Sequence, residues 1–86
     1  MMAKLSIEDI IISPNPFADI FTISTVNGLV LNGNFALSNL QGQQVMSAEI
    51  RNEKQFTIDL NHFARAIYLL KMQVGEGVVI RKLVKM

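Results

Sequence analysis

The chain has 86 residues, half of them apolar and only 17% charged, which suits one small folded domain and excludes an intrinsically disordered chain. Eight basic and seven acidic residues leave a net charge of +1, which removes the electrostatic argument for a nucleic-acid binder. With no cysteine and a single histidine, the sequence excludes disulfides, thiolate sites and a histidine-rich metal site.

The N-terminal segment is not expected to be a secretory signal, because Glu8 and Asp9 interrupt the apolar run that such a signal needs. No window approaches the roughly 20 apolar residues of a membrane-spanning helix. The first predicted strand is 7–13. It must end at Pro14-Asn15-Pro16, because both prolines lack the amide hydrogen of a sheet ladder. This corner is expected to be stiff, with Phe17 tucked beneath it.

Short strands separated by turn signals are predicted along the rest of the chain. Asn27-Gly28 and Asn32-Gly33 predict hairpin turns, because both residue types tolerate positive φ. Further turns are expected at Gln41-Gly42, 51–54 and 75–77. Strands this short and closely spaced predict a β-sandwich or barrel. They are expected at 18–26, 29–31, 34–39, 43–50, 55–60, 66–74 and 78–85.

Alternation with a period of two identifies the inward faces of these strands. It places Phe35 and Leu37 on one face of their strand, and Phe56 and Ile58 on one face of theirs. One apolar face is typical of half-buried antiparallel strands. The residues predicted to form the core are Phe21, Ile23, Phe35, Leu37, Val45, Phe56, Ile58, Tyr68, Leu70 and Met72.

The segment 61–73 fits two structures. Apolar residues from Leu60 through Phe63 to Ile67 follow a helical spacing, and Asn61 is a suitable N-cap. Periodicity alone therefore leaves helix and strand open. If the segment is a strand, Tyr68 sits just inside it after a loop. That position is similar to the tyrosine corner of immunoglobulin-like sandwiches, whose hydroxyl bonds to the backbone upstream.

No group of residues in the sequence carries the signature of an enzyme or a cofactor. Most carboxylates fall at predicted turns or outward strand positions, which is typical of solvated surface rather than a paired acid–base site. His62 lies in a loop, and the sequence has no Gly-x-Ser-x-Gly elbow and no phosphate-binding glycine motif. Calcium held by turn carboxylates and carbonyls stays open as an alternative.

Four segments resemble, in the same order, the C-terminal sorting domains of the type IX secretion system. Residues 12–17 are similar to the family's Tyr-Pro-Asn-Pro opening. Residues 35–45 are similar to its middle pattern of an aliphatic strand and an Asp or Asn turn, followed by Gly, a basic or polar residue and Val. Residues 58–72 resemble its Ile-Asp-Leu-Ser and Gly-Ile-Tyr-Leu-Val-Lys block, and residues 81–85 its closing basic-aliphatic strand. The chain departs from this pattern at Ser13, Ser38 and Ala66, where the family often has Tyr, an aromatic residue and Gly.

The resemblance implies an all-β fold, an immunoglobulin-like antiparallel β-sandwich of about seven strands, which favours strand over helix in 61–73. It implies a non-enzymatic signal, without a cofactor, at the end of a Bacteroidota precursor. The signal passes through the periplasm, takes its N-terminal cargo domain across the outer membrane through a translocon, and is usually removed by a surface sortase. The cargo then reaches the cell surface or the extracellular space. Residues 5–86 would form the sorting domain and 1–4 a linker or added residues, with cleavage before Leu5.

The resemblance also implies roles for single residues. Translocon recognition is expected at Arg81, Lys82, Leu83, Val84 and Lys85, and structural roles at Pro14, Asn15, Pro16, Gly42 and Tyr68. Residues 71–86 hold four basic residues and one acidic residue. The residues by themselves fit a second interpretation, in which lysines protect an edge strand from pairing with another chain.

Two other functions remain open at this point. One is an accessory sandwich that binds a ligand or carbohydrate, which is weakened because the chain has no Trp and most Phe residues face inward. The other is an adhesion module that joins copies through an edge strand, with a homodimer formed by exchange of a terminal strand.

Overall fold

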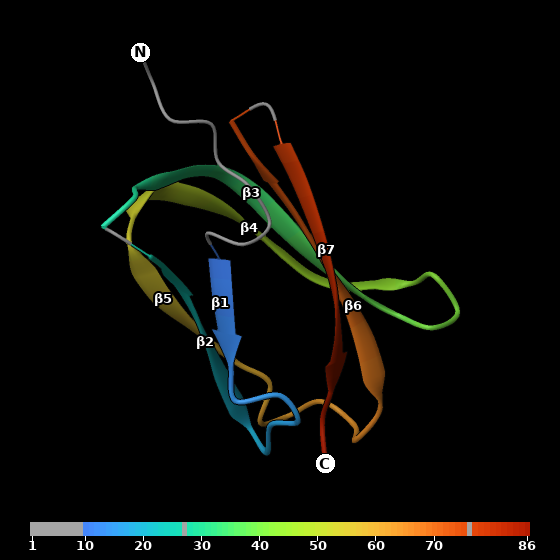
Figure 1. The fold of residues 1–86 in the computed structure, drawn as a ribbon. Helices are drawn as coiled ribbons and strands as arrows, with labels where there is room; N and C mark the ends of the chain where they lie inside the picture. The colour runs from blue at the N-terminus through green and yellow to red at the C-terminus, as the bar shows by residue number, and fades with distance from the viewer. Residues whose placement is uncertain (1–9, 27, 76) are drawn as a thin grey trace.

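The computed structural model describes residues 10–26, 28–75 and 77–86, and within these ranges every regular element is a strand (Figure 1). The first three strands are β1 (Ile10–Ser13), β2 (Ile20–Thr25) and β3 (Leu31–Asn39). They are followed by β4 (Gln44–Glu53), β5 (Gln55–Asp59), β6 (Ile67–Val74) and β7 (Gly77–Val84). The all-β fold of about seven strands that the resemblance implied is therefore confirmed.

The strands form two antiparallel sheets that face each other (Figure 1). One sheet has the order β1-β2-β5 and the other the order β4-β3-β6-β7. β3–β4 and β6–β7 are hairpins within the larger sheet, whereas the chain changes sheets after β2, after β4 and after β5. This arrangement is the expected immunoglobulin-like sandwich. Its open sides lie between the edge strands β1 and β7 and between β4 and β5.

The core consists of the inward side chains of both sheets. All predicted core residues are buried except Val45 and Phe56, which are partly buried and pack against it. Phe17 is 2% exposed beneath the proline corner, as expected, and its ring meets that of Phe21 edge-on at 5.0 Å between centroids. The core also includes residues that the sequence analysis left out, namely Ile10, Leu31, Ile50, Leu60, Val74, Val79 and Leu83.

Two predicted hairpins are wrong. Asn32-Gly33 lies inside β3, which runs without interruption where two short strands were expected. The register against β4 shifts between Leu31 and Gly33, so the glycine marks a bulge instead of a turn. Asn27-Gly28 joins β2 to β3, which belong to different sheets, so it does not form a hairpin; Gly28 has φ +68°, and Asn27 is outside the described residues.

Two segments differ from the prediction in their bounds or in their type of structure. The turn expected at 51–54 is largely strand, because β4 continues to Glu53 and the chain crosses to the other sheet at Lys54. The helix alternative for 61–73 is wrong, because β6 starts at Ile67 and alternates buried and exposed residues. β6 lies between β3 and β7, so hydrogen bonds to both neighbours hold it extended. The predicted start of the first strand, the linker 1–4 and the cleavage position lie outside the described residues.

Candidate recognition surface

The last residues of β7 are held by the proline corner. β7 is an edge strand, yet the Asn15 side chain donates to the Lys82 carbonyl and accepts from the Val84 amide, both at 3.0 Å. The Phe17 amide donates to the Val84 carbonyl, and the Met86 amide donates to the Phe17 carbonyl, both at 2.9 Å. The corner therefore supplies the ladder partners that this part of the edge would otherwise lack. Both X-Pro bonds of the corner are cis.

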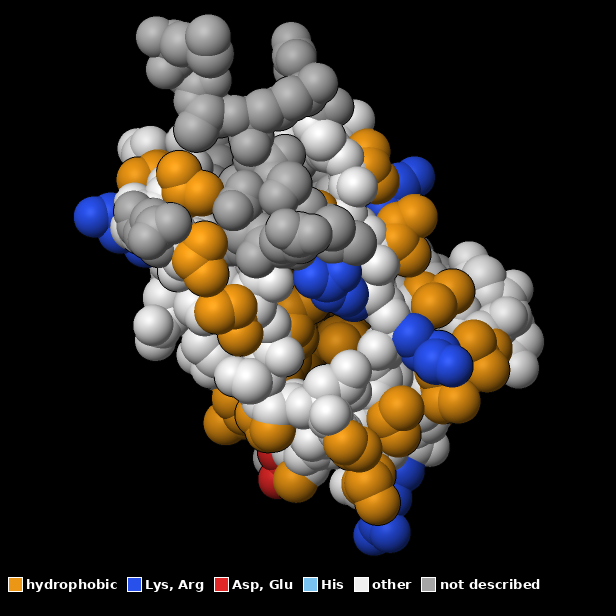
Figure 2. Space-filling model, viewed as in Figure 1, with side chains coloured by type: hydrophobic (Ala, Val, Ile, Leu, Met, Phe, Trp, Pro, Cys, Tyr) orange, Lys and Arg blue, Asp and Glu red, His pale blue; other side chains and the backbone are white. Residues whose placement is uncertain are grey.

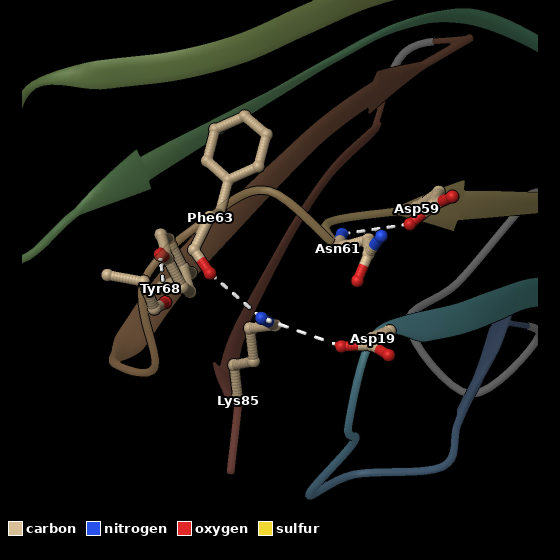
Figure 3. A network of polar contacts seen from close by, with 7 residues as sticks. Asp19, Asp59, Asn61, Phe63, Tyr68 and Lys85 are labelled. Atoms are coloured by element: carbon tan, nitrogen blue, oxygen red, sulfur yellow. Dashed lines mark hydrogen bonds and ion pairs between the residues drawn. The ribbon is translucent and has the colours of Figure 1, made fainter.

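Lys85 is a buried lysine next to the C-terminal residue (Figure 3). Its side chain is 6% exposed, and its Nζ donates to the Phe63 carbonyl at 2.8 Å. The Asp19 carboxylate lies 3.7 Å from the same Nζ, and the Lys85 amide donates to the Ala66 carbonyl. Lys85 thus ties the C-terminal segment to the loop before β6 and to the loop before β2. Its long aliphatic stem is buried together with this polar junction.

Tyr68 lies beside this junction (Figure 3). Its ring is buried, and its hydroxyl donates to the Ala64 carbonyl, four residues upstream, at 2.5 Å. This is the contact that a tyrosine corner makes. At the start of the same loop, the Asn61 amide donates to the Asp59 carboxylate at 2.8 Å. Both contacts shape the crossing from β5 to β6.

The turn at Gly42 closes the β3–β4 hairpin. Gly42 has φ +87°, which favours glycine. The Asn39 side-chain oxygen accepts from the amides of Gln41 and Gln43 at 3.0 Å, and its Nδ2 donates to the Gln43 side chain at 2.9 Å. The asparagine before the glycine therefore organises the whole turn.

The five tail residues expected to contact a translocon lie in different environments. Leu83 is fully buried and Lys85 is 7% exposed, so neither presents a side chain to a partner of the folded domain. Arg81 is half-buried and donates to the Ile10 carbonyl at 3.3 Å, across the gap between the sheets. Val84 is half-buried, and Lys82 is exposed. The fold therefore displays Lys82 fully and two of its neighbours in part.

Lys82 belongs to a larger surface on the outer face of β6 and β7, which we call the basic-aliphatic face. In the strand register Lys82 is opposite Leu69, and Lys71 is opposite Ile80. Leu69, Val78 and Ile80 are 37%, 50% and 58% exposed. On the side that carries β6 and β7, Figure 2 shows Lys and Arg side chains interleaved with hydrophobic ones.

The sequence analysis did not select the other members of this face. The alternating pattern of the sequence could have identified them, because every second residue of β6 and β7 points away from the core. In a continuous segment such as 81–85, this alternation divides the side chains between the two faces of the strand. A folded strand presents every other residue, so the neighbours of Lys82 come from β6 and from the start of β7.

The other side of the sandwich has a hollow between β4 and β5 of about 480 Å³. Its lining includes the stacked rings of Phe35 and Phe56, whose centroids are 5.9 Å apart. Within the described ranges, no group of three or more His, Cys, Asp or Glu residues is placed to hold a metal ion. The same part of the chain contains no helix of the length and hydropathy that crossing a membrane requires.

Comparison with known proteins places this chain in a family. The model of the secretion system C-terminal sorting domain matches residues 11–86, which include six whole strands and most of β1. A comparison with curated proteins gives no significant match. Because the family match covers nearly the whole chain, this protein belongs to the secretion system C-terminal sorting domain family, whose members are generally non-catalytic signals that engage the type IX secretion machinery and export an attached cargo to the cell surface or beyond.

Proposed function

We propose that this domain is an address that is read in its folded state. It directs a cargo protein on its N-terminal side through the periplasm and across the outer membrane by the type IX translocon, and a surface sortase then removes it. The observation that supports a folded address is the burial of Leu83 and Lys85 inside the sandwich. A partner that bound residues 81–85 as an extended peptide would first have to break the contacts of both.

The five tail residues then have two different tasks. Lys82 contacts the translocon, and the half-buried Arg81 and Val84 contribute at its sides. Leu83 and Lys85 do not contact the translocon; they stabilise the fold, because they hold the C-terminal segment against the core and the neighbouring loops. This division separates side chains that can be changed without unfolding the domain from those that cannot.

The proposal is tested by export of a reporter. A signal peptide and a reporter are fused before the chain and expressed in a host that has the type IX machinery. Lys82→Glu should leave the reporter in the periplasm, whereas Lys54→Glu should not, because the same charge change then lies on an exposed residue at the far corner of the sandwich. Both purified variants should unfold at the same denaturant concentration as the parent.

Deletion of residues 81–86 is less informative, because it removes Leu83 and Lys85 and with them part of the core. Leu83→Ala is the better test of the folded state, because it should cost about 2–5 kcal/mol and reduce export in proportion to the unfolded fraction. Normal export of Lys82→Glu would overturn the role of the tail surface. Normal export of a fully unfolded variant would overturn the folded address.

Sortase removal has a separate readout. Mass spectrometry of the exported reporter should find a C-terminus before Leu5 and none of the sandwich. An exported reporter that still carries the intact domain would contradict removal while leaving the export role in place.

A further inference from the structure

The hollow between β4 and β5 is an apolar groove with an acidic rim. Its floor is formed by Phe35, Met46, Ile50, Phe56 and Ile58. Its rim carries Glu49, Glu53, Asp59 and Arg51. Arg51 is paired with Glu49 at 2.8 Å, so Glu53 and Asp59 give the rim its net negative charge.

The two open sides of the sandwich differ in how they are closed. Between β1 and β7, Asn15 and Phe17 bond to the backbone of β7, and Arg81 bonds to the Ile10 carbonyl. Between β4 and β5, the side chains leave a hollow of about 480 Å³, and of its apolar lining Met46 and Phe56 are partly exposed. Binding to a groove of this kind is most favourable for a partner that presents apolar groups with positive charges beside them.

The chain itself carries a surface of that chemistry. On the basic-aliphatic face, Ile80 is 58% exposed and has Lys71 opposite it on β6 and Lys82 two residues further along β7. Both lysines are therefore within about 5–7 Å of Ile80 at their Cβ atoms. β4 and β7 are opposite edges of one sheet, so the face of a molecule cannot reach its own groove.

We propose that the acidic groove of one copy receives the basic-aliphatic face of a second copy. Ile80 enters the apolar groove, and Lys71 and Lys82 lie against Glu53 and Asp59. Because the two surfaces are different, the contact is head-to-tail. Each bound copy leaves a free groove or face for the next, so the assembly does not stop at a dimer. It therefore differs from a dimer formed by strand exchange, in which both copies contribute the same strand.

Sedimentation equilibrium of the purified chain tests this association. The average mass should rise with concentration beyond that of a dimer, and added salt should weaken the association. Lys82→Glu on the face and Glu53→Lys on the rim should each weaken binding by about tenfold or more. Arg65→Glu, an equal charge reversal in the exposed loop before β6, should leave it unchanged.

Mixing the two variants gives the most specific result. The Lys82→Glu variant keeps an intact groove and the Glu53→Lys variant keeps an intact face, so the equimolar mixture should associate more strongly than either variant alone. The proposal is overturned by a chain that stays monomeric up to about 1 mM, a range in which even millimolar dissociation constants become visible. It is equally overturned by a dimer that persists in both variants, or by a mixture that does not associate.

This inference does not depend on the export function. Glu53→Lys separates the two, because it changes the groove without altering the tail, and it should weaken the association while export continues.

Discussion

The Val84 amide donates a 3.0 Å hydrogen bond to the Asn15 side chain, although 69 residues separate them in the chain. Together with the bond from Asn15 to the Lys82 carbonyl, it closes the edge of the last strand. An asparagine between two prolines thus takes the place of a neighbouring strand. The corner and the tail, both part of the family pattern, form one structural unit.

Replacing Asn15 by Ala should destabilise the domain by about 2 kcal/mol, because two hydrogen bonds of about 1 kcal/mol each are lost. Urea unfolding should show a lower midpoint with an unchanged slope. Asn61→Ala, in an exposed loop, is the control and should stay within about 0.5 kcal/mol of the parent. Equal midpoints for the two variants would show that the corner does not hold the tail.

Lysines of the tail should differ sharply in their contribution to stability. Lys85→Ala removes a buried stem and the bond to the Phe63 carbonyl, and should cost about 2–3 kcal/mol. Lys82→Ala, the same change at an exposed site, should cost less than about 0.5 kcal/mol. Denaturant unfolding of both variants measures the difference.

The Asp19 carboxylate is 58% exposed and 3.7 Å from Lys85, so the ion pair itself should matter little. Asp19→Ala should cost less than about 1 kcal/mol, and the loss should shrink in high salt. A loss as large as that of Lys85→Ala would mean that the ion pair, and not the carbonyl bond, holds the junction.

Tyr68→Phe tests the corner contact with Ala64. The ring keeps its place in the core while the hydroxyl bond disappears, so a loss of about 1 kcal/mol is expected. Amide exchange should accelerate in the loop 60–66, whereas the β3–β4 hairpin serves as an internal reference. Faster exchange in both regions would indicate general destabilisation and contradict a local role.

Gly33 and Gly42 should respond differently to the same substitution. An alanine Cβ at Gly33 would lie 1.8 Å from the Gln73 carbonyl oxygen, so Gly33→Ala should cost more than about 4 kcal/mol or prevent folding. An alanine Cβ at Gly42 would have no heavy atom within 4 Å apart from those of its chain neighbours. Gly42→Ala should therefore cost only about 1–2 kcal/mol, because of the positive φ. Circular dichroism and unfolding midpoints measure both. Similar losses would contradict the close approach of β6 to β3.

Local chemistry of the sequence determined most of the strands and the core. The alternation around Phe35 and Phe56, the stop at the prolines and the turn at Gly42 each depend on a few adjacent residues, and the structure places them accordingly. The family pattern was equally readable, because it consists of short motifs in a fixed order. Such features are encoded locally, so a single chain is enough to find them.

Only the tertiary structure decided features that join distant segments. The spacing of apolar residues in 61–73 also fits a helix. The second half of this segment is the strand β6 because it pairs with a neighbouring strand on each side. Asn32-Gly33 has the composition of a turn, yet the glycine is needed where another backbone comes close. Lys85 belongs to a basic tail, and it is buried because the fold brings Phe63 and Asp19 to it. Burial depends on which segments pack together, and residue type alone does not specify that partner.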